Sequence, residues 1–297
     1  MNKSRGFPYI LETHLVDHCD LNCKGCSHFS PLVSDKVLLN FNTYEHDLSR
    51  LRNLFSDVYE IRLMGGEPLL SPEINSYMIS TRQAFPKANV VVFTNGLLLT
   101  KMPESFWEIC AQYQISIKIS KYPVPLDEKS IIPLGESYQV KIKIPGEIQS
   151  FMQFINIEGN SDPEISFRNC RTMYTTPFLG EGKLYSCSFA PHVHIFNEYF
   201  NQEIPISEYD FIDIHDPHIS PDDIFHFLDH PIPMCKWCKT RRPMMGWGTS
   251  KKEINEWIGG EINPFSHLFQ IRKYKVISKY HQYKQISEMK KRNRHEH

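Results

Sequence analysis

The sequence predicts an α/β protein with a parallel sheet, and three observations lead to that prediction. Short β-rich runs alternate with segments of helical periodicity from residue 9 to about residue 145. The runs end in polar loops or glycine turns, and the helical segments separate consecutive runs. Such alternation is typical of parallel βαβ units, and the loops at the carboxyl ends of the strands hold the active sites of β/α barrels.

Each element rests on a local pattern. The first strand, 9–16, leads into a cysteine-rich loop, and the helix 43–55 places Tyr44, Leu48 and Leu51 on related faces. A proline begins the next helix, and Asn95-Gly96 stops the third strand. A weaker helix is expected between the last two strands. The remaining predicted elements are the strands 60–64, 89–94, 114–120 and 138–144 and the helices 72–85 and 103–113.

The composition excludes several classes of protein. The chain has 297 residues, 41% of them hydrophobic, and a net charge of −1, so a packed core is expected and a nucleic-acid partner is not. No apolar run reaches the roughly 18 residues of a membrane span. The first 15 residues lack the apolar region of a secretory signal, so we expect a cytoplasmic protein whose clustered thiols serve metal or redox chemistry.

Three cysteines follow the first strand with the spacing C-x3-C-x2-C: Cys19, Cys23 and Cys26. They could bind structural zinc if His18 or His28 supplied a fourth ligand. They could also hold a [4Fe–4S] cluster with one iron left open. The turn Gly65–Gly66–Glu67–Pro68 after the second strand favours the cluster, because a glycine pair lets the backbone approach a ligand closely.

These two motifs, in this order, resemble those of the radical S-adenosylmethionine (radical SAM) superfamily. The resemblance implies a partial (β/α)6 TIM barrel and a cluster whose open iron chelates the amino and carboxylate groups of SAM. It also implies reductive cleavage of SAM to a 5′-deoxyadenosyl radical, which removes a hydrogen atom from a substrate. Residues carried over to the SAM site are Gly65, Gly66 and Glu67 at the amino group, and Thr94, Asn95 and Ser120 toward the ribose or carboxylate.

The chain departs from the family pattern just before the third cysteine. Members often carry an aromatic residue there, close to the adenine, whereas this sequence has Gly25. Phe29 or another side chain would have to supply the contact. Asn95 and Ser120 also have a simpler reading as turn residues.

Four further cysteines lie in the second half: Cys170, Cys187, Cys235 and Cys238. The segment between the first two contains "GEGK" and reads as a β-hairpin, while the last two form a C-x2-C pair. Their spacing alone fits zinc or a [4Fe–4S] cluster. They resemble the twitch or shortened SPASM extension of radical SAM enzymes, which implies one auxiliary [4Fe–4S] cluster. Cys110, on a predicted helix, is expected to be a buried structural thiol.

The resemblance implies a division into three parts: residues 1–160 as the radical SAM core, 161–250 as the auxiliary domain with its hairpin and helix, and 251–297 as a basic helical tail. Four thiols would close the auxiliary cluster, so its expected role is electron transfer. The late cysteines resemble those of a radical SAM dehydrogenase that oxidises a secondary alcohol of an aminocyclitol.

We therefore expect dehydrogenation or epimerisation of a small polar substrate, such as a carbohydrate, an aminocyclitol or a nucleotide sugar. An external flavodoxin or ferredoxin is the expected electron donor. A peptide-modifying radical SAM maturase and a non-catalytic zinc-bound interaction module are the alternatives, and the substrate itself is not encoded in any motif.

Several weaker signals have an ordinary structural explanation as well as a functional one. His192 and His194 fall on one side of a possible strand and are either a metal pair or surface residues. The polar loop 210–218 could supply a base that deprotonates a radical intermediate, or its side chains could only stabilise turns and helix caps. Tryptophans with nearby arginines could line a substrate pocket, shield the auxiliary cluster, or simply pack in the core. The polar loop offers Asp210, Asp213, His215 and Asp216, and the aromatic set is Trp237, Trp247 and Trp257 with Arg241 and Arg242.

Overall fold

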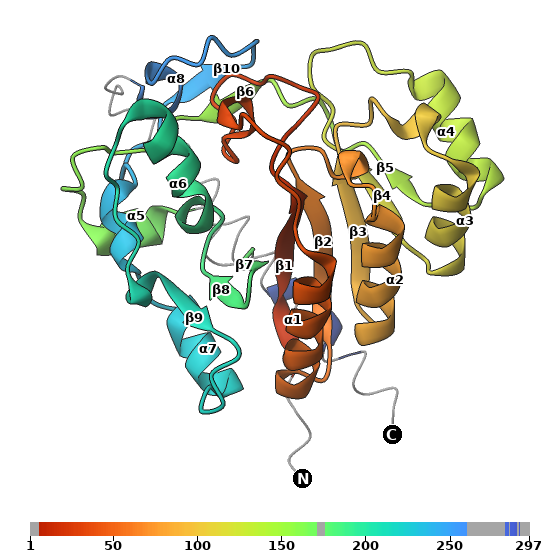
Figure 1. Ribbon diagram of the computed structural model, residues 1–297, viewed down its shortest axis with the longest axis horizontal. Coiled ribbons are helices and arrows are strands. Elements are labelled where there is room, and N and C mark those ends of the chain that lie inside the picture. The colour runs from red at the N-terminus through yellow and green to blue at the C-terminus, as the bar shows by residue number, and fades with distance from the viewer. Residues whose placement is uncertain (1–5, 171–175, 260–282, 285, 290, 292–297) are drawn as a thin grey trace.

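The computed structural model describes residues 6–170, 176–259, 283–284, 286–289 and 291. Its centre is an eight-stranded sheet in the order β5-β4-β3-β2-β1-β7-β8-β9, and a separate pair is formed by β10 and β6 (Figure 1). The strands are β1 (Phe7–Val16), β2 (Val58–Gly65), β3 (Asn89–Thr94), β4 (Ser116–Ile119), β5 (Ile142–Lys143), β6 (Ser150–Met152), β7 (Phe178–Gly180), β8 (Lys183–Tyr185), β9 (Phe211–Asp213) and β10 (Met244–Gly246).

The α-helices separate the parallel strands and then dominate the second half of the chain. They are α1 (Phe41–Leu54), α2 (Ile74–Ala84), α3 (Glu104–Gln112), α4 (Glu128–Ser137), α5 (Pro163–Asn169), α6 (Phe189–Phe200), α7 (Pro221–Leu228) and α8 (Asn255–Ile258). Short 3-10 helices lie between them: η1 (Ser30–Leu32), η2 (Pro68–Leu70), η3 (Leu99–Lys101), η4 (Glu208–Asp210) and η5 (Pro233–Trp237). In the described part of the chain no helix is both long and apolar enough to cross a membrane.

The strands β1 to β5 pair in parallel in chain order, which confirms the predicted α/β class and the partial barrel. A sixth parallel strand, β7, pairs with β1 on the opposite side from β2. β7 and β8 form the antiparallel hairpin that the sequence predicts around Gly182. The hairpin extends the main sheet, so the second half of the chain is built directly onto the first.

The two faces of the parallel sheet differ in chemistry. On the face covered by helices, alternate strand residues such as Leu11, Leu63, Val92 and Ile117 belong to one hydrophobic cluster. The residues between them point to the other face, because successive strand side chains alternate. That inner face carries charged and polar groups from three strands, β1, β2 and β4: Glu12, His14, Glu60, Arg62, Ser116 and Lys118.

A second hydrophobic cluster lies in the later part of the chain and joins it to the cysteine loop. Phe29 packs there against Phe189, Phe196 and Trp257. Figure 1 places the β6–β10 pair beyond the carboxyl end of β1. The segment that follows β10 pairs with the cysteine loop, since Lys24 N–H donates to the Gly248 carbonyl at 2.8 Å.

One predicted element is wrong. His192 and His194 lie on the helix α6, not on a strand. Helical geometry separates the two side chains, so His192 is buried and His194 is exposed. Most of the predicted basic tail lies outside the described residues. The domain boundaries at residues 160 and 250 stay a prediction.

Candidate active site and cysteine clusters

The loop after β1 brings Cys19, Cys23 and Cys26 together. Cys26 N–H donates to the Cys23 carbonyl at 3.3 Å, which folds the loop into a turn. Burial raises the pKa of Cys23 to about 11 and also raises the pKa of Cys19 and of Cys26. The negative charge of the Cys26 thiolate raises the pKa of Cys19 and of Cys23 further. Thiolates that repel one another in a buried loop form a site for a cationic centre, which reverses that repulsion.

The glycine turn fixes this loop through the backbone. Gly66 N–H donates to the Val16 carbonyl at 2.8 Å, and Glu67 N–H donates to the His18 carbonyl at 3.0 Å. A Cβ on Gly65 would lie 2.1 Å from the Val16 carbonyl oxygen, and a Cβ on Gly66 would lie 2.1 Å from that of His18. No other residue fits this approach, so the glycine pair has a structural reason beside its predicted role with SAM.

Glu67 joins the turn to the end of β3. Its buried carboxylate accepts hydrogen bonds from the Thr94 hydroxyl at 2.7 Å and from Asn95 N–H at 2.8 Å. It also accepts from Leu69 N–H at 3.1 Å. Burial raises the pKa of Glu67 to about 7, although these hydrogen bonds lower it. Of the side chains carried over to the SAM site, those of Glu67 and Thr94 contact one another.

Asn95 and Ser120 complete the rim of the sheet. The Asn95 amide donates to the Asp20 carboxylate at 2.6 Å and lies 3.9 Å from the Cys19 sulfur. Ser120 N–H donates to the Thr94 carbonyl at 2.8 Å, so Ser120 lies beside the same strand end. The structure therefore gathers the six predicted residues at the carboxyl ends of β2, β3 and β4, and the glycine turn and Asn95 contact the loop that holds the three cysteines.

The histidines considered as a fourth ligand are placed differently. The His28 ring packs against the His14 ring with centroids 4.5 Å apart, and it hydrogen-bonds the Gly65 backbone. Burial lowers the pKa of His28 to about 4. Among the described residues, no group of three ligand atoms within 4.8 Å of one another includes His18, His28 or a cysteine. Phe29 is fully buried in the second hydrophobic cluster, which leaves no exposed face for an adenine ring.

Two aromatic residues near the loop were not assigned to it from the sequence. The indole N–H of Trp247 donates to the Cys23 sulfur at 3.3 Å. The Tyr122 ring stacks near Trp247, with centroids 6.4 Å apart, and burial together with the thiolates raises its pKa. Trp247 is 224 residues away from Cys23 in the chain, and no local pattern encodes such a contact.

The four late cysteines also converge, although they come from separate segments. Cys170 ends α5, Cys187 precedes α6, and Cys235 and Cys238 lie in and after η5. Burial raises the pKa of Cys187 to about 11 and of Cys235 to about 12, and the other late thiolates raise both further.

The guanidinium of Arg242 lies against this group of sulfurs. Arg242 Nη1 approaches the Cys170 sulfur at 3.7 Å. Burial lowers the pKa of Arg242, but the charges of Cys170, Cys238 and Cys187 raise it overall. Arg242 therefore supplies a compensating cation beside these thiolates.

The remaining signals mostly have structural roles. Cys110 is buried against the Met78 sulfur at 3.7 Å, as predicted. Asp210 accepts from Met234 N–H and caps η4, and Trp257 is fully buried. The indole N–H of Trp257 donates to the Cys26 carbonyl at 2.8 Å. In the polar loop, Asp213 accepts from His215 N–H, Asp216 accepts from His218 N–H, and the His215 ring contacts Asp47 at 2.7 Å.

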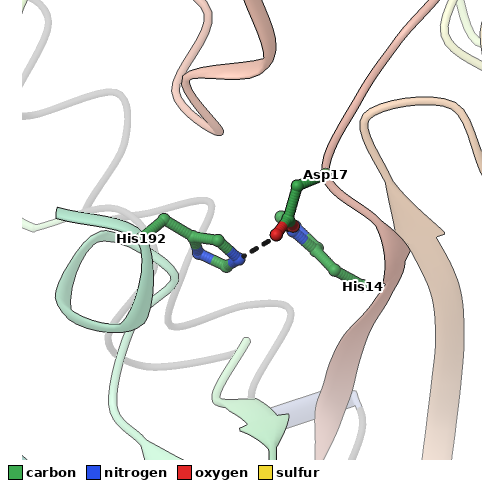
Figure 2. Close-up of side chains that lie close together, drawn as sticks. All are labelled: His14, Asp17 and His192. Carbon is green, nitrogen blue, oxygen red and sulfur yellow. Dashed lines mark hydrogen bonds and ion pairs between the residues drawn. The ribbon is translucent and has the colours of Figure 1, made fainter. Parts of the chain in front are cut away.

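His192 belongs to a buried polar group that the sequence did not reveal. His14 from β1 and His192 from α6 approach the carboxylate of Asp17 from two sides (Figure 2). The His14 Nδ1–Asp17 distance is 3.2 Å and the His192 Nε2–Asp17 distance is 3.6 Å. Burial and the neighbouring imidazoles lower the pKa of His14. Burial raises the pKa of Asp17, but the hydrogen bonds from His14 and His192 lower it overall.

Comparison with known proteins agrees with the core of this site. A family model described as a 4Fe-4S single cluster domain matches residues 9–136, which contain the three-cysteine loop and the glycine turn. A GTP 3',8-cyclase of Trichodesmium erythraeum is 31% identical over 101 residues, which is 33% of this chain and 30% of that protein. A second from Microcystis aeruginosa is 28% identical over 100 residues, with the same shares. These matches span less than a third of the relatives' length.

Solved structures show a weaker likeness. BtrN in complex with AdoMet and 2-DOIA has a TM-score of 0.49 and 17% identity, over 80% of this chain and 94% of that chain. Native anSMEcpe with bound AdoMet and Cp18Cys peptide has a TM-score of 0.36 and 18% identity, over 46% of this chain and 42% of that chain. At these scores the likeness carries no inference about substrate.

The family model agrees with the [4Fe–4S] cluster predicted for Cys19, Cys23 and Cys26. The order of the motifs along the parallel sheet is the order predicted for a radical SAM core: first strand, three-cysteine loop, second strand, glycine turn. Residues 9–136 are therefore similar to a 4Fe-4S single cluster domain, with the motif order expected of a radical SAM core.

Proposed function

We propose that the chain is an enzyme that cleaves SAM reductively and abstracts a hydrogen atom from a small polar substrate. The observation that carries the proposal is the fixed geometry of the three-cysteine loop against the glycine turn, with hydrogen bonds of 2.8 and 3.0 Å. A [4Fe–4S] cluster and SAM, when bound, supply the radical chemistry. The chain's own contribution is to hold three thiolates, to order the rim around them and to exclude water.

The donor set fits that cluster. His28 is engaged with His14 and the Gly65 backbone, so it does not supply a fourth protein ligand. Two thiolates on one tetrahedral zinc would have sulfurs about 3.8 Å apart, given Zn–S bonds of about 2.3 Å. The three sulfurs do not all lie within 4.8 Å of one another, since no such group among the described residues contains a cysteine. Three cysteine sulfurs that lie farther apart than zinc requires, with no histidine ligand beside them, suit a [4Fe–4S] cluster that leaves one iron open.

For SAM, we propose that the rim residues act in two ways. The Glu67 carboxylate already accepts from three donors, so it acts mainly by holding the turn and the end of β3 in register. The backbone of Gly65 and Gly66 would then face the amino group. Asn95 and Ser120 would reach the carboxylate or ribose, and Tyr122 is the aromatic side chain best placed to replace Phe29 beside the adenine.

We propose that Cys170, Cys187, Cys235 and Cys238 hold an auxiliary [4Fe–4S] cluster that transfers electrons. Four thiolates from the protein would occupy every iron, which leaves none to bind substrate. The nearby Arg242 guanidinium offsets the negative charge of a four-thiolate cluster. Loss of a hydrogen atom and a proton from the substrate would leave one electron for such a cluster, which gives a net two-electron oxidation.

A polar substrate is supported by the inner face of the parallel sheet. Arg62 pairs with Glu12 at 2.8 Å and with Glu60 at 2.7 Å, and its guanidinium lies over the Phe93 ring. Lys118 lies over the same ring, with its nitrogen 4.6 Å from the centroid. This charged face suits hydroxyl, amino or phosphate groups rather than an apolar ligand. We also propose that the protein acts in the cytoplasm and that a flavodoxin or ferredoxin donates the electron for SAM cleavage.

The test is anaerobic reconstitution followed by incubation with reductant, SAM and candidate substrates. Formation of 5′-deoxyadenosine that depends on one substrate supports the proposal, and deuterium transfer identifies the hydrogen removed. Carbohydrates, aminocyclitols and nucleotide sugars are the first candidates, with GTP included because the matched relatives are named GTP 3',8-cyclases. Turnover of a peptide would favour the maturase alternative. Stoichiometric zinc without iron would contradict the enzyme.

A further inference from the structure

A group of three side chains beside the cysteine loop has the composition of a separate metal site. His14 lies on the inner face of β1, Asp17 follows that strand, and His192 comes from α6 (Figure 2). Their ligand atoms all lie within 4.8 Å of one another. Two imidazoles and one carboxylate are the donors that borderline divalent ions such as Zn²⁺ and Fe²⁺ take in proteins.

The hydrogen bonding of His192 directs its Nε2 toward the Asp17 carboxylate. Its Nδ1 lies 2.6 Å from the Ser188 carbonyl, which can only accept, so Nδ1 carries the proton. In the neutral ring, Nε2 then presents a lone pair toward the Asp17 carboxylate at 3.6 Å. Two acceptors face one another there unless Nε2 carries a second proton and donates to Asp17, and a bound cation satisfies both groups without that proton. A carbonyl that fixes the distal nitrogen is also the usual outer contact of a metal-bound histidine.

The distances match a single ion. Two donors, each about 2.1 Å from a metal, lie about 3.0 Å apart at a right angle and about 3.4 Å apart at a tetrahedral angle. The His14–Asp17 and His192–Asp17 distances are 3.2 and 3.6 Å, so small side-chain rotations are enough. His14 and His192 are buried, with rings 4.1 Å apart, which excludes water from two sides of the site.

Asp17 also connects this group to a cavity. A cavity of about 410 Å³ is lined by Asp17, by the segment after Leu32 and by α6 residues that include His194 and Glu198. A three-ligand ion at Asp17 would keep positions open on that side for an oxygen ligand.

We propose that His14, Asp17 and His192 form a binding site for a divalent transition ion, distinct from both cysteine groups. The site is assembled by the contact between the end of β1 and α6, so it ties the later half of the chain to the parallel sheet.

Zinc is the probe for the test. The protein with reconstituted clusters is desalted and titrated with ZnSO₄ against a chromophoric chelator, and the bound metal is examined by X-ray absorption at the zinc edge. We expect about one zinc per chain with nitrogen and oxygen ligands at about 2.0–2.1 Å. His192→Ala and the nearly isosteric Asp17→Asn should each weaken binding by at least about 100-fold, since even loss of an outer contact costs 10–100-fold.

Two controls locate the metal. His194→Ala removes an exposed histidine from the same helix and should leave binding unchanged. His215→Ala tests whether zinc binds instead at the other described group of two histidines and one aspartate, which is His46, Asp47 and His215. If His192→Ala fails to fold, the nearly isosteric Asp17→Asn still tests the site, and a melting curve of that variant shows that it is folded. Absence of zinc, a spectrum with sulfur ligands alone, loss of zinc only in His215→Ala, or unchanged affinity in Asp17→Asn would each overturn the proposal. The readout does not depend on SAM cleavage.

Discussion

The three early cysteines and the four late ones are held by different kinds of interaction. The early loop spans eight residues and is fixed by backbone hydrogen bonds to the glycine turn. The late group draws on three separate segments and on Arg242, and it is assembled by side-chain packing in the second hydrophobic cluster. A site built on strand ends is encoded locally, whereas a site built on irregular segments depends on the whole later half being folded.

Cysteine replacement should separate the two groups most strongly. Cys19→Ala should abolish SAM cleavage, because the first cluster loses a ligand. The double variant Cys235→Ala, Cys238→Ala should retain uncoupled SAM cleavage but lose substrate turnover. Each should lower iron from about eight to about four atoms per chain. Cys110→Ala, at a buried thiol away from both groups, is the control and should change neither. Undiminished turnover in the double variant would contradict the electron-transfer role.

Gly66→Ala should break the early site through its backbone alone. The added Cβ would lie 2.1 Å from the His18 carbonyl oxygen and 2.6 Å from that of Asp17. Neither atom is the end of a flexible side chain, so we expect a loss of about 3 kcal/mol or more in the free energy of unfolding. Iron analysis should show loss of the first cluster. Gly246→Ala is the matched control, because its Cβ meets nothing within 4 Å; equal stability of the two variants would count against the account.

Arg242→Met should affect the late group and spare the early one. Removing the cation beside four thiolates should lower the reduction potential of the second cluster by on the order of 100 mV, since net charge sets cluster potentials. The exposed Arg241 offers the control Arg241→Met, which should leave the potential nearly unchanged. Redox titration followed by EPR checks both variants. A shift confined to the first cluster would show that Arg242 has been placed wrongly.

Glu67 should make the early site sensitive to pH. Burial raises the pKa of Glu67 to about 7 from its ordinary value of 4.5, so the folded protein binds a proton that the unfolded chain releases. Its contribution to stability is complete below pH 4.5 and is lost as the pH rises through about 7. Glu67→Gln should flatten this slope, which amounts to about 3 kcal/mol at most. Parallel stability curves for the two proteins between pH 4.5 and 7.5 would contradict the assignment.

The smallest effect is expected from the indole hydrogen bond to Cys23. Trp247→Phe removes an N–H donor that lies 3.3 Å from the Cys23 sulfur. Hydrogen bonds to cluster sulfurs raise the reduction potential, so the first cluster should shift downward by on the order of tens of millivolts. Trp257→Phe is the comparison, because its indole donates to the Cys26 carbonyl and not to a sulfur. Equal shifts in both would show that packing, not the hydrogen bond, matters.

The sequence predicted what depends on local pattern. The strand–helix alternation, the cysteine spacing, the glycine turn and the hairpin around Gly182 all appear in the structure where expected. Contacts between distant segments could not be read in this way, and Trp247 with Cys23 is the clearest case. His192 was placed on a strand because a short alternating run of apolar and polar residues fits either element. Its position beside His14 depends on how α6 packs on β1.

The central claim is that the early cluster leaves one iron open for SAM. Pulsed ENDOR on the reduced Cys235→Ala, Cys238→Ala variant observes that cluster alone, with SAM labelled by ¹⁵N at the amino group and ¹⁷O at the carboxylate. We expect hyperfine coupling from both labels. Coupling to a histidine nitrogen with neither label detected would contradict the account.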